Sequence, residues 1–110
     1  MKIKIIFVVI GMLFMGILNA ENTIIKISAL ASGKLLLNGQ DSSLPTIETE
    51  LKNTKGVVWY FRENPQSEPP PEAMAVIELV VKYKLPISMS SKPDFSDYID
   101  ENGNSKPRKP

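Results

Sequence analysis

The sequence predicts an α+β fold, a two-layer sandwich in which two helices cover one face of a mixed β-sheet. Three observations lead to this prediction. Short apolar runs with a period of two alternate with two longer amphipathic runs, turn residues separate the runs, and their order is β-β-α-β-α-β. Because each helix joins two strands that can be parallel neighbours, both helices are expected on the same side of one sheet.

A short leader precedes the predicted domain. Lys2 and Lys4 are followed by the apolar run Ile5–Leu18 and then by Asn19-Ala20. This is the layout of a secretory signal peptide, with cleavage expected after Ala20. The alternative is an uncleaved membrane anchor, but the apolar run has fourteen residues, whereas a spanning helix needs about 20.

Cleavage defines the expected organisation of the chain. Residues 1–20 form the signal peptide, residues 21–91 the α+β domain, and residues 92–110 a polar, flexible C-terminal tail. The chain contains no cysteine, so no disulfide supports the domain in the oxidising periplasm of a Gram-negative-type envelope. Two of the thirteen Lys and Arg lie in the leader, which leaves eleven against twelve Asp and Glu. A net charge of about −1 favours neither nucleic acid nor an anionic membrane as a partner.

The domain begins with a predicted hairpin. Thr23–Ala31 alternates apolar and polar residues, which is typical of a strand. Ser32-Gly33 supplies a reversal, and Lys34–Leu37 returns as the second strand. Asn38-Gly39 ends this strand in a turn, because both residues tolerate positive φ.

The first helix follows. Ser42 or Ser43 is the predicted N-cap, and Pro45 suits the first turn, where its missing N–H is not needed. Apolar residues recur at helical spacing on one stripe, and Gly56 ends the helix. The residues of the stripe are Leu44, Ile47 and Leu51.

The second half of the domain repeats strand and helix. Val57–Phe61 is β-branched and aromatic throughout, as expected of an interior strand. After a polar, proline-rich loop, a helix is predicted from Glu72 to Tyr83 or Lys84, with Glu78 and Lys82 as an outward i,i+4 pair. Pro86 breaks this helix before a short last strand. That strand is Ile87–Ser90, and the inward residues of the helix are Ala73, Val76, Ile77 and Val80.

Several of these features occur together in one known family. The glycine turn, the strand "LLLNG" with its serine-led helix, and a strand ending in Arg62 before a loop, a helix and a final strand span Ile24–Ser91. This combination resembles the periplasmic domain of the ExbD/TolR biopolymer-transport family. The resemblance implies a domain that accompanies a proton-driven inner-membrane motor and contacts peptidoglycan or a periplasmic protein. That family carries an aspartate in its membrane helix, whereas Ile5–Leu18 has no acidic residue, so we expect an exported soluble domain rather than a motor subunit.

The richest contact surface in the sequence is the aromatic part of the third strand. Along a strand, Trp59 and Phe61 point one way and Tyr60 and Arg62 the other. We expect Trp59 and Phe61 in the core, because aromatic side chains dominate the burial of small domains. Tyr60 and Arg62 then lie on an open sheet face, and both residue types are enriched in binding hot spots.

The loop and the tail supply the other candidate partner-binding residues. The loop Glu63–Pro71 is rich in proline, so Glu63 and Pro70 belong to a stiff segment that can be presented to a partner. In the tail, Phe95 and Tyr98 lie among acidic residues. This segment either folds back on the sheet or is a docking segment that orders on binding.

The sequence contains no recognisable catalytic pattern. Histidine and cysteine, which supply the usual acid–base, nucleophilic and metal-binding groups, are absent. Glu48 and Glu50 do not face each other on a helix and are interpreted as a solvated surface. Asp94, Asp97 and Asp100 lack the spacing and the distant bidentate glutamate of an EF-hand loop. We therefore expect no enzyme activity, no cofactor and no metal.

These expectations combine into a non-catalytic periplasmic binding module that engages an envelope protein or peptidoglycan. No stable membrane anchor remains after cleavage, and a homodimer through the free edge of the last strand is a further possibility. The alternative is a small periplasmic inhibitor or immunity-type protein that blocks an exported enzyme. A small hydrolase is the third reading, and the sequence supports it least.

Overall fold

The computed structural model describes residues 23–108, so the expected signal peptide lies outside the described residues. Two helices and seven strands occur in this range. In chain order they are β1 (Ile24–Ala29), β2 (Leu35–Leu37), β3 (Gln40–Ser42), α2 (Leu44–Asn53), β4 (Val57–Arg62), α3 (Pro71–Lys82), β5 (Ile87–Ser90), β6 (Asp97–Ile99) and β7 (Ser105–Pro107).

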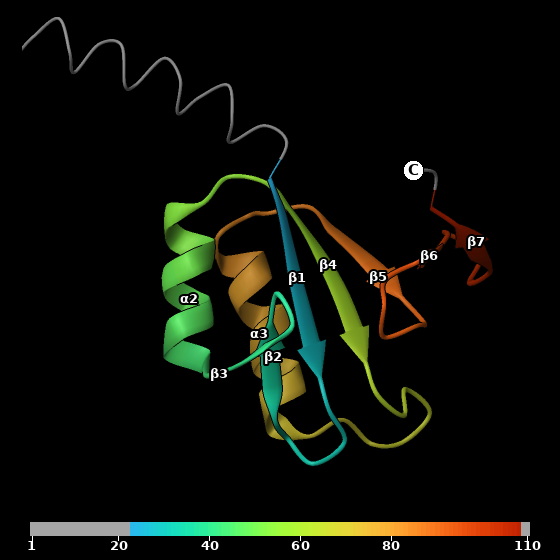
Figure 1. The fold of residues 1–110 in the computed structure, drawn as a ribbon, viewed down its shortest axis with the longest axis horizontal. Coiled ribbons are helices and arrows are strands. Elements are labelled where there is room, and N and C mark those ends of the chain that lie inside the picture. Colours follow the sequence, from blue (N-terminus) through green and yellow to red (C-terminus); the bar gives the residue numbers. More distant parts are fainter. Residues whose placement is uncertain (1–22, 109–110) are drawn as a thin grey trace, which may run out of the picture.

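The main sheet has five strands in the order β3-β2-β1-β4-β5. β1 pairs antiparallel with β2, and β2 with β3, whereas the β1–β4 and β4–β5 pairs are parallel. Both α2 and α3 lie on the same side of this sheet (Figure 1). The predicted α+β class, the mixed sheet and the one-sided helix layer are confirmed.

The N-terminal part of the sheet contains one strand more than the sequence predicts. Asn38 and Gly39 have positive φ angles of 53° and 85°, as in a tight two-residue hairpin turn. The turn leads into β3, in which Asp41 pairs with Leu36 of β2. Asp41 is exposed at this sheet edge and forms an ion pair of 3.4 Å with Lys34. β3 was missed because its sequence is polar and has no apolar alternation.

The N-terminus of α2 follows the expected capping pattern. The Ser43 hydroxyl accepts a hydrogen bond from the Thr46 N–H at 3.4 Å, so Ser43 rather than Ser42 is the cap. Ile47 and Leu51 are buried against the sheet. Two of the three predicted stripe residues therefore form the core side of α2, and the third, Leu44, packs against the core while partly buried.

The second helix, α3, begins one residue before its predicted start, at Pro71. Proline suits this position because the first N–H groups of a helix have no intrahelical partner. Ala73, Val76 and Val80 are buried as predicted, and Ile77 is partly buried at the margin of the core.

β4 presents the opposite faces from those expected. Val58 and Tyr60 are 0% and 2% exposed and belong to the core between sheet and helices. The Tyr60 hydroxyl donates a hydrogen bond to the Ala73 carbonyl at 3.1 Å, so its one polar group is satisfied inside the protein. Trp59 and Phe61 point to the other side of the sheet. The prediction that Tyr60 lies on an open face is therefore wrong.

The outer face of β4 is covered by the C-terminal segment, which is not the flexible tail that its composition predicts. β6 and β7 pair antiparallel, and this hairpin lies beyond β5 (Figure 1). Phe95 is buried, with its ring centroid 6.5 Å from that of Trp59. The Arg108 guanidinium lies 3.8 Å from the centre of the Trp59 ring and donates hydrogen bonds to the hydroxyls of Ser88 and Ser90. Of the two alternatives for Phe95, the structure shows the folded-back one.

We predict that Tyr60→Ala lowers the free energy of unfolding by about 3–5 kcal/mol, as for other large aromatic residues removed from a core. Tyr60→Phe keeps the ring and removes only the hydrogen bond to Ala73, so its cost is about 1 kcal/mol. Urea unfolding of both variants measures these costs. An unchanged unfolding midpoint in Tyr60→Ala contradicts the burial of the ring.

Trp59 is the only tryptophan in the chain, so its fluorescence reports on docking of the hairpin. Arg108→Ala removes the stacked guanidinium and its bonds to the two serines. We predict a red-shifted emission and stronger quenching by acrylamide, with an unchanged far-UV circular dichroism spectrum. Lys106→Ala is the control, because Lys106 is exposed in β7. Equal quenching of wild type and Arg108→Ala contradicts the stacking.

Candidate functional site

The sandwich leaves part of the sheet uncovered because the sheet is wider than the helix layer. Packed helices lie about 8–10 Å apart and neighbouring strands about 4.8 Å apart, so two helices span about four strands. α3 turns Ala73, Val76 and Val80 toward the core. The helix layer covers β5, at the edge of the sheet, only in part. Met74 in α3 is 50% exposed, and Ile87 and Met89 in β5 are 40% and 42% exposed. Exposed apolar side chains therefore lie on both sides of the same gap.

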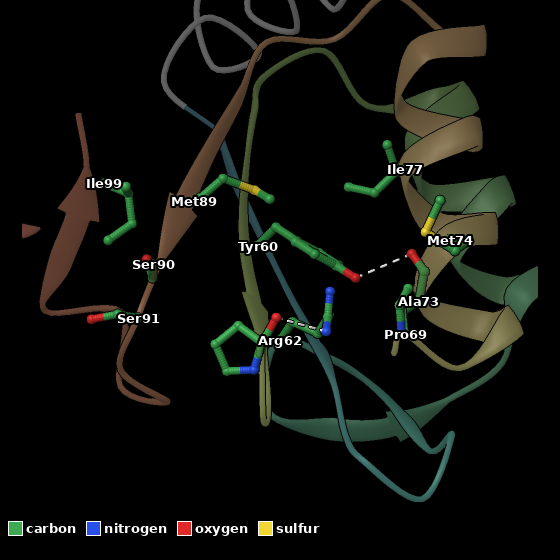
Figure 2. A pocket seen from close by; sticks show the side chains of 11 residues that line it. Tyr60, Arg62, Pro69, Ala73, Met74, Ile77, Met89, Ser90, Ser91 and Ile99 are labelled. Carbon is green, nitrogen blue, oxygen red and sulfur yellow. Dashed lines mark hydrogen bonds between the residues drawn. The ribbon is translucent and has the colours of Figure 1, made fainter. Parts of the chain in front are cut away.

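A groove of about 500 Å³ lies between α3 and β5, with β4 as its floor (Figure 2). Its lining is mostly apolar and comes from β4, the loop after β4, α3, β5 and the C-terminal hairpin. The main contributors are Tyr60, Arg62, Met74, Ile77, Met89 and Ile99. A pocket of this size and lining is typical of a binding site for an apolar ligand.

Arg62 is the charged residue of the groove. Its Nη2 group donates hydrogen bonds to the backbone carbonyls of Asn64 and Pro65, at 3.3 and 2.9 Å, and to that of Ser67. Its Nε atom is buried and has no hydrogen-bond partner. Within residues 23–108, Arg62 forms no ion pair with a carboxylate. The guanidinium is thus oriented by the loop while its charge is not neutralised.

The Tyr60 ring forms part of the groove floor, and its hydroxyl is already engaged with Ala73 (Figure 2). Burial raises the pKa of Tyr60, and the nearby positive charge of Arg62 offsets this only in part. The phenol therefore stays protonated near neutral pH. Tyr60 contributes an apolar surface to the groove rather than an acid–base group.

The structure brings two of the predicted partner-binding residues, Tyr60 and Arg62, to one site, but on the helix side of the sheet. Glu63 is exposed outside the groove, and its Oε1 accepts a hydrogen bond from the Ala31 N–H at 2.8 Å. Pro70 is partly buried and occupies the position before the first residue of α3. Both residues therefore hold the ends of the loop in place.

Of the two predicted residues of the tail, Tyr98 lies in β6 and Phe95 lies just before it, and neither lines the groove. Phe95 is buried next to Trp59, and its φ of 60° is a strained backbone angle for a bulky residue. Tyr98 is 37% exposed. The methionines of the groove, Met74 and Met89, were not predicted as site residues. Methionine has an unbranched, polarisable side chain and is common at binding surfaces that adapt to their ligand. The residue type was therefore the one feature of the sequence that could have identified these two positions.

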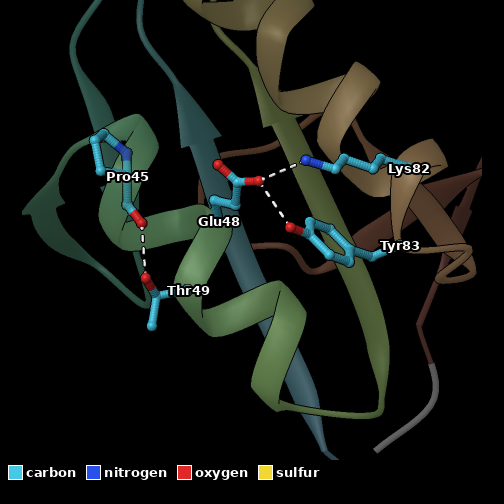
Figure 3. A network of polar contacts seen from close by, with 5 residues as sticks. All are labelled: Pro45, Glu48, Thr49, Lys82 and Tyr83. Atoms are coloured by element: carbon cyan, nitrogen blue, oxygen red, sulfur yellow. Dashed lines mark hydrogen bonds and ion pairs between the residues drawn. The ribbon is translucent and has the colours of Figure 1, made fainter.

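A second polar cluster joins the two helices (Figure 3). Glu48 Oε2 accepts hydrogen bonds from Tyr83 Oη at 2.7 Å and from Lys82 Nζ at 3.0 Å. These bonds, that from Tyr83 first and that from Lys82 next, lower the pKa of Glu48. Lys82 thus pairs with Glu48 of α2, and the expected pair with Glu78 is wrong. Glu48 is not a purely solvated residue either, because it links α2 to the end of α3.

A buried carboxylate holds the C-terminal hairpin. Asp97 is 2% exposed and accepts hydrogen bonds from the hydroxyls of Ser91 and Ser105, at 2.5 and 2.6 Å, and from the Ser91 N–H. Burial alone raises the pKa of Asp97, but the bonds from Ser105 and Ser91 outweigh it and lower the pKa from 3.8 to about 2. The carboxylate is therefore ionised and ties β6 both to the end of β5 and to β7.

The lowered pKa of Asp97 predicts a pH dependence of stability. Because the folded pKa lies below the ordinary value, the ionised carboxylate stabilises the fold above about pH 4, and this contribution is lost as the pH falls through about 2. We predict that Asp97→Asn lowers the urea midpoint at neutral pH and that the difference from wild type narrows toward pH 2. Asp41→Asn, at an exposed ion pair, is the control with little effect. A difference that is constant with pH contradicts the lowered pKa.

Within the described range, no group of three or more Asp, Glu, His or Cys side chains is arranged to hold a metal ion. None of the helices in residues 23–108 has the length and hydrophobicity needed to span a membrane.

The chain matches no protein-family model, and no curated protein or solved structure is significantly similar to it. The likeness to the ExbD/TolR family therefore rests on the order and spacing of the elements alone.

Proposed function

We propose that this protein is an exported, non-catalytic binding module that receives an apolar segment of a partner protein of the cell envelope in the α3–β5 groove. The observation that carries this proposal is the groove itself, in which Met74, Ile77 and Met89 present apolar surface around a floor formed by Tyr60. Exposed apolar side chains gathered in one concave site are costly in water and are typical of interaction sites.

The chemistry of the lining favours a polypeptide over peptidoglycan. Glycan hydroxyls require polar partners, and a polar ligand without them loses its hydrogen bonds to water. The two serines that line the groove already donate their hydroxyl hydrogens, Ser90 to the Asp97 carbonyl and Ser91 to the Asp97 carboxylate. Apolar side chains of a protein segment fit this lining, and the two flexible methionines can adapt to them.

A non-catalytic role is supported by the state of the titratable groups at the groove. The Tyr60 hydroxyl donates to Ala73, and its raised pKa keeps it protonated. The Nη2 group of Arg62 is engaged with backbone carbonyls of the loop. The groove thus offers shape, apolar surface and one positive charge, which are the requirements of binding.

Export is the second part of the proposal and rests on the leader. β1 begins at Ile24, four residues after Ala20, so cleavage after Ala20 leaves every described residue in the mature protein. The helices and strands β1, β2, α2, β4, α3 and β5 follow the order expected for a domain that resembles the ExbD/TolR periplasmic domain. This order supports a role among envelope proteins.

The groove can be mapped by photocrosslinking in cells that export the full-length protein. A benzoylphenylalanine residue replaces Met74 or Met89 in the groove, or Val81 as a control. Val81 lies on the same helix, is apolar and is 69% exposed, but does not line the groove. We predict that the two groove positions capture the same partner protein and that Val81 does not. Met89→Asp, which places a charge in the apolar groove, is expected to weaken binding of that partner at least about tenfold.

The crosslinks also test export, because the captured partner must come from the periplasmic or envelope fraction. A cytoplasmic partner contradicts the export part of the proposal. Crosslinks of equal yield from Val81 and Met74, or a partner whose affinity is unchanged by Met89→Asp, contradict the assignment of the groove.

A further inference from the structure

We infer, on the basis of the proposed function, that the partner segment ends inside the groove and that its C-terminal carboxylate pairs with Arg62. Three properties of the site lead to this ligand class. They are the charge left unneutralised on Arg62, the loop that flanks the groove at the Arg62 end, and the apolar surface next to the guanidinium.

The first property is charge. Arg62 lines an apolar groove, and a positive charge in such surroundings is stabilised by an anion. Within residues 23–108 the ion pairs are Lys34–Asp41 and Lys82–Glu48, and neither involves Arg62. Nη2 is used by the carbonyls of the loop, and Nε is buried without a partner, so a ligand in the groove meets the charge of the guanidinium rather than a free pair of N–H groups. A carboxylate is the anion that a polypeptide supplies to such a charge.

The second property is the loop at the Arg62 end of the groove. β4 ends at Arg62 and α3 begins at Pro71, so the intervening loop runs from the floor of the groove to its wall. Pro65 and Pro69 of this loop line the groove, and the Pro65 carbonyl accepts a hydrogen bond from Arg62; Pro69 is seen in Figure 2. The loop therefore flanks the groove at the Arg62 end, and a partner segment that ends there brings its terminal carboxylate to Arg62.

The third property is the apolar surface that contacts the C-terminal side chains of the partner segment. Met74 and Ile77 on α3 face Met89 on β5 across the groove (Figure 2). An apolar residue at or next to the C-terminus buries its side chain here while its carboxylate points to Arg62. Recognition of a chain end by one fixed cation and one apolar pocket requires few ordered residues, which limits the entropy lost on binding.

Isosteric peptides that differ only at the terminal group test this inference directly. The protein purified after export is titrated with acetylated tetrapeptides whose last two positions are drawn from Leu, Ile, Val, Met and Phe. One pool has free C-terminal acids and the other has C-terminal amides. We expect the acid pool to bind at least about tenfold more tightly, with amide resonances of α3 and β5 shifting in NMR spectra. This advantage is expected to shrink as salt is raised.

Two variants separate the charge from the fold. Arg62→Met is expected to remove the advantage of the acid pool over the amide pool, so that the ratio of the two affinities falls to within about twofold of one. Lys34→Met is the control, because Lys34 is 53% exposed in its side chain and pairs with Asp41 outside the groove. If Arg62 only holds the loop, its replacement weakens both pools equally, and the inference is overturned. The comparison of the two pools on the wild-type protein remains decisive if Arg62→Met does not fold.

The remaining outcomes distinguish this inference from the proposed function. If both pools bind equally and Met89→Asp weakens both, the groove receives a polypeptide but does not recognise its end. If an amidated peptide with an internal glutamate binds as tightly as the acid pool, Arg62 pairs with a side-chain carboxylate. The inference that it recognises a C-terminal carboxylate is then wrong. If neither pool binds and the photocrosslinks also fail to map to the groove, the inference and the proposed function are both overturned.

Discussion

The arrangement of this domain depends on which face of β4 turns toward the helices. β4 lies between β1 and β5 and pairs with both, so its register orients the side chains of its neighbours. With Val58 and Tyr60 inward, the phenol reaches the Ala73 carbonyl and fixes the N-terminal turn of α3 to the sheet. Arg62, two residues further along, then lies on the same face at the end of the groove. Trp59 lies on the opposite face, where the C-terminal hairpin covers it.

Much of this fold was predictable from the sequence because its elements carry strong local signals. The serine cap and the apolar stripe of α2, and the helical spacing of buried residues in α3, are patterns with a direct physical cause. The face of β4 was not predictable in the same way. The strand "VVWYFR" has apolar residues on both faces, so the alternation of side chains does not show which face turns toward the helices. Only contacts with residues distant in the sequence decide this. Tyr60 is suited to the inner face by the Ala73 carbonyl, which accepts its hydroxyl hydrogen, and Trp59 to the outer face by the stacked Arg108.

The hairpin and the groove lay beyond sequence reasoning for different reasons. Residues 92–108 are polar, and their order comes from one buried carboxylate, one stacked guanidinium and the rings of Phe95 and Trp59. These contacts join positions far apart in the chain, so they produce no periodic pattern of apolar residues in the sequence. The groove arises from the difference in width between two helices and five strands, which depends on how the layers are aligned. Arg62 was identified from its residue type, but its neighbours Met74 and Met89 are exposed residues of ordinary amphipathic segments.

The two margins of the main sheet have opposite character. β3 is polar and exposed, and Asp41 with Lys34 places both signs of charge along it. β5 carries Ile87 and Met89. Charged residues on a margin discourage further strands from joining there. Edge-to-edge growth of the sheet is therefore discouraged at the β3 margin, while the C-terminal hairpin lies beyond β5 at the other margin (Figure 1).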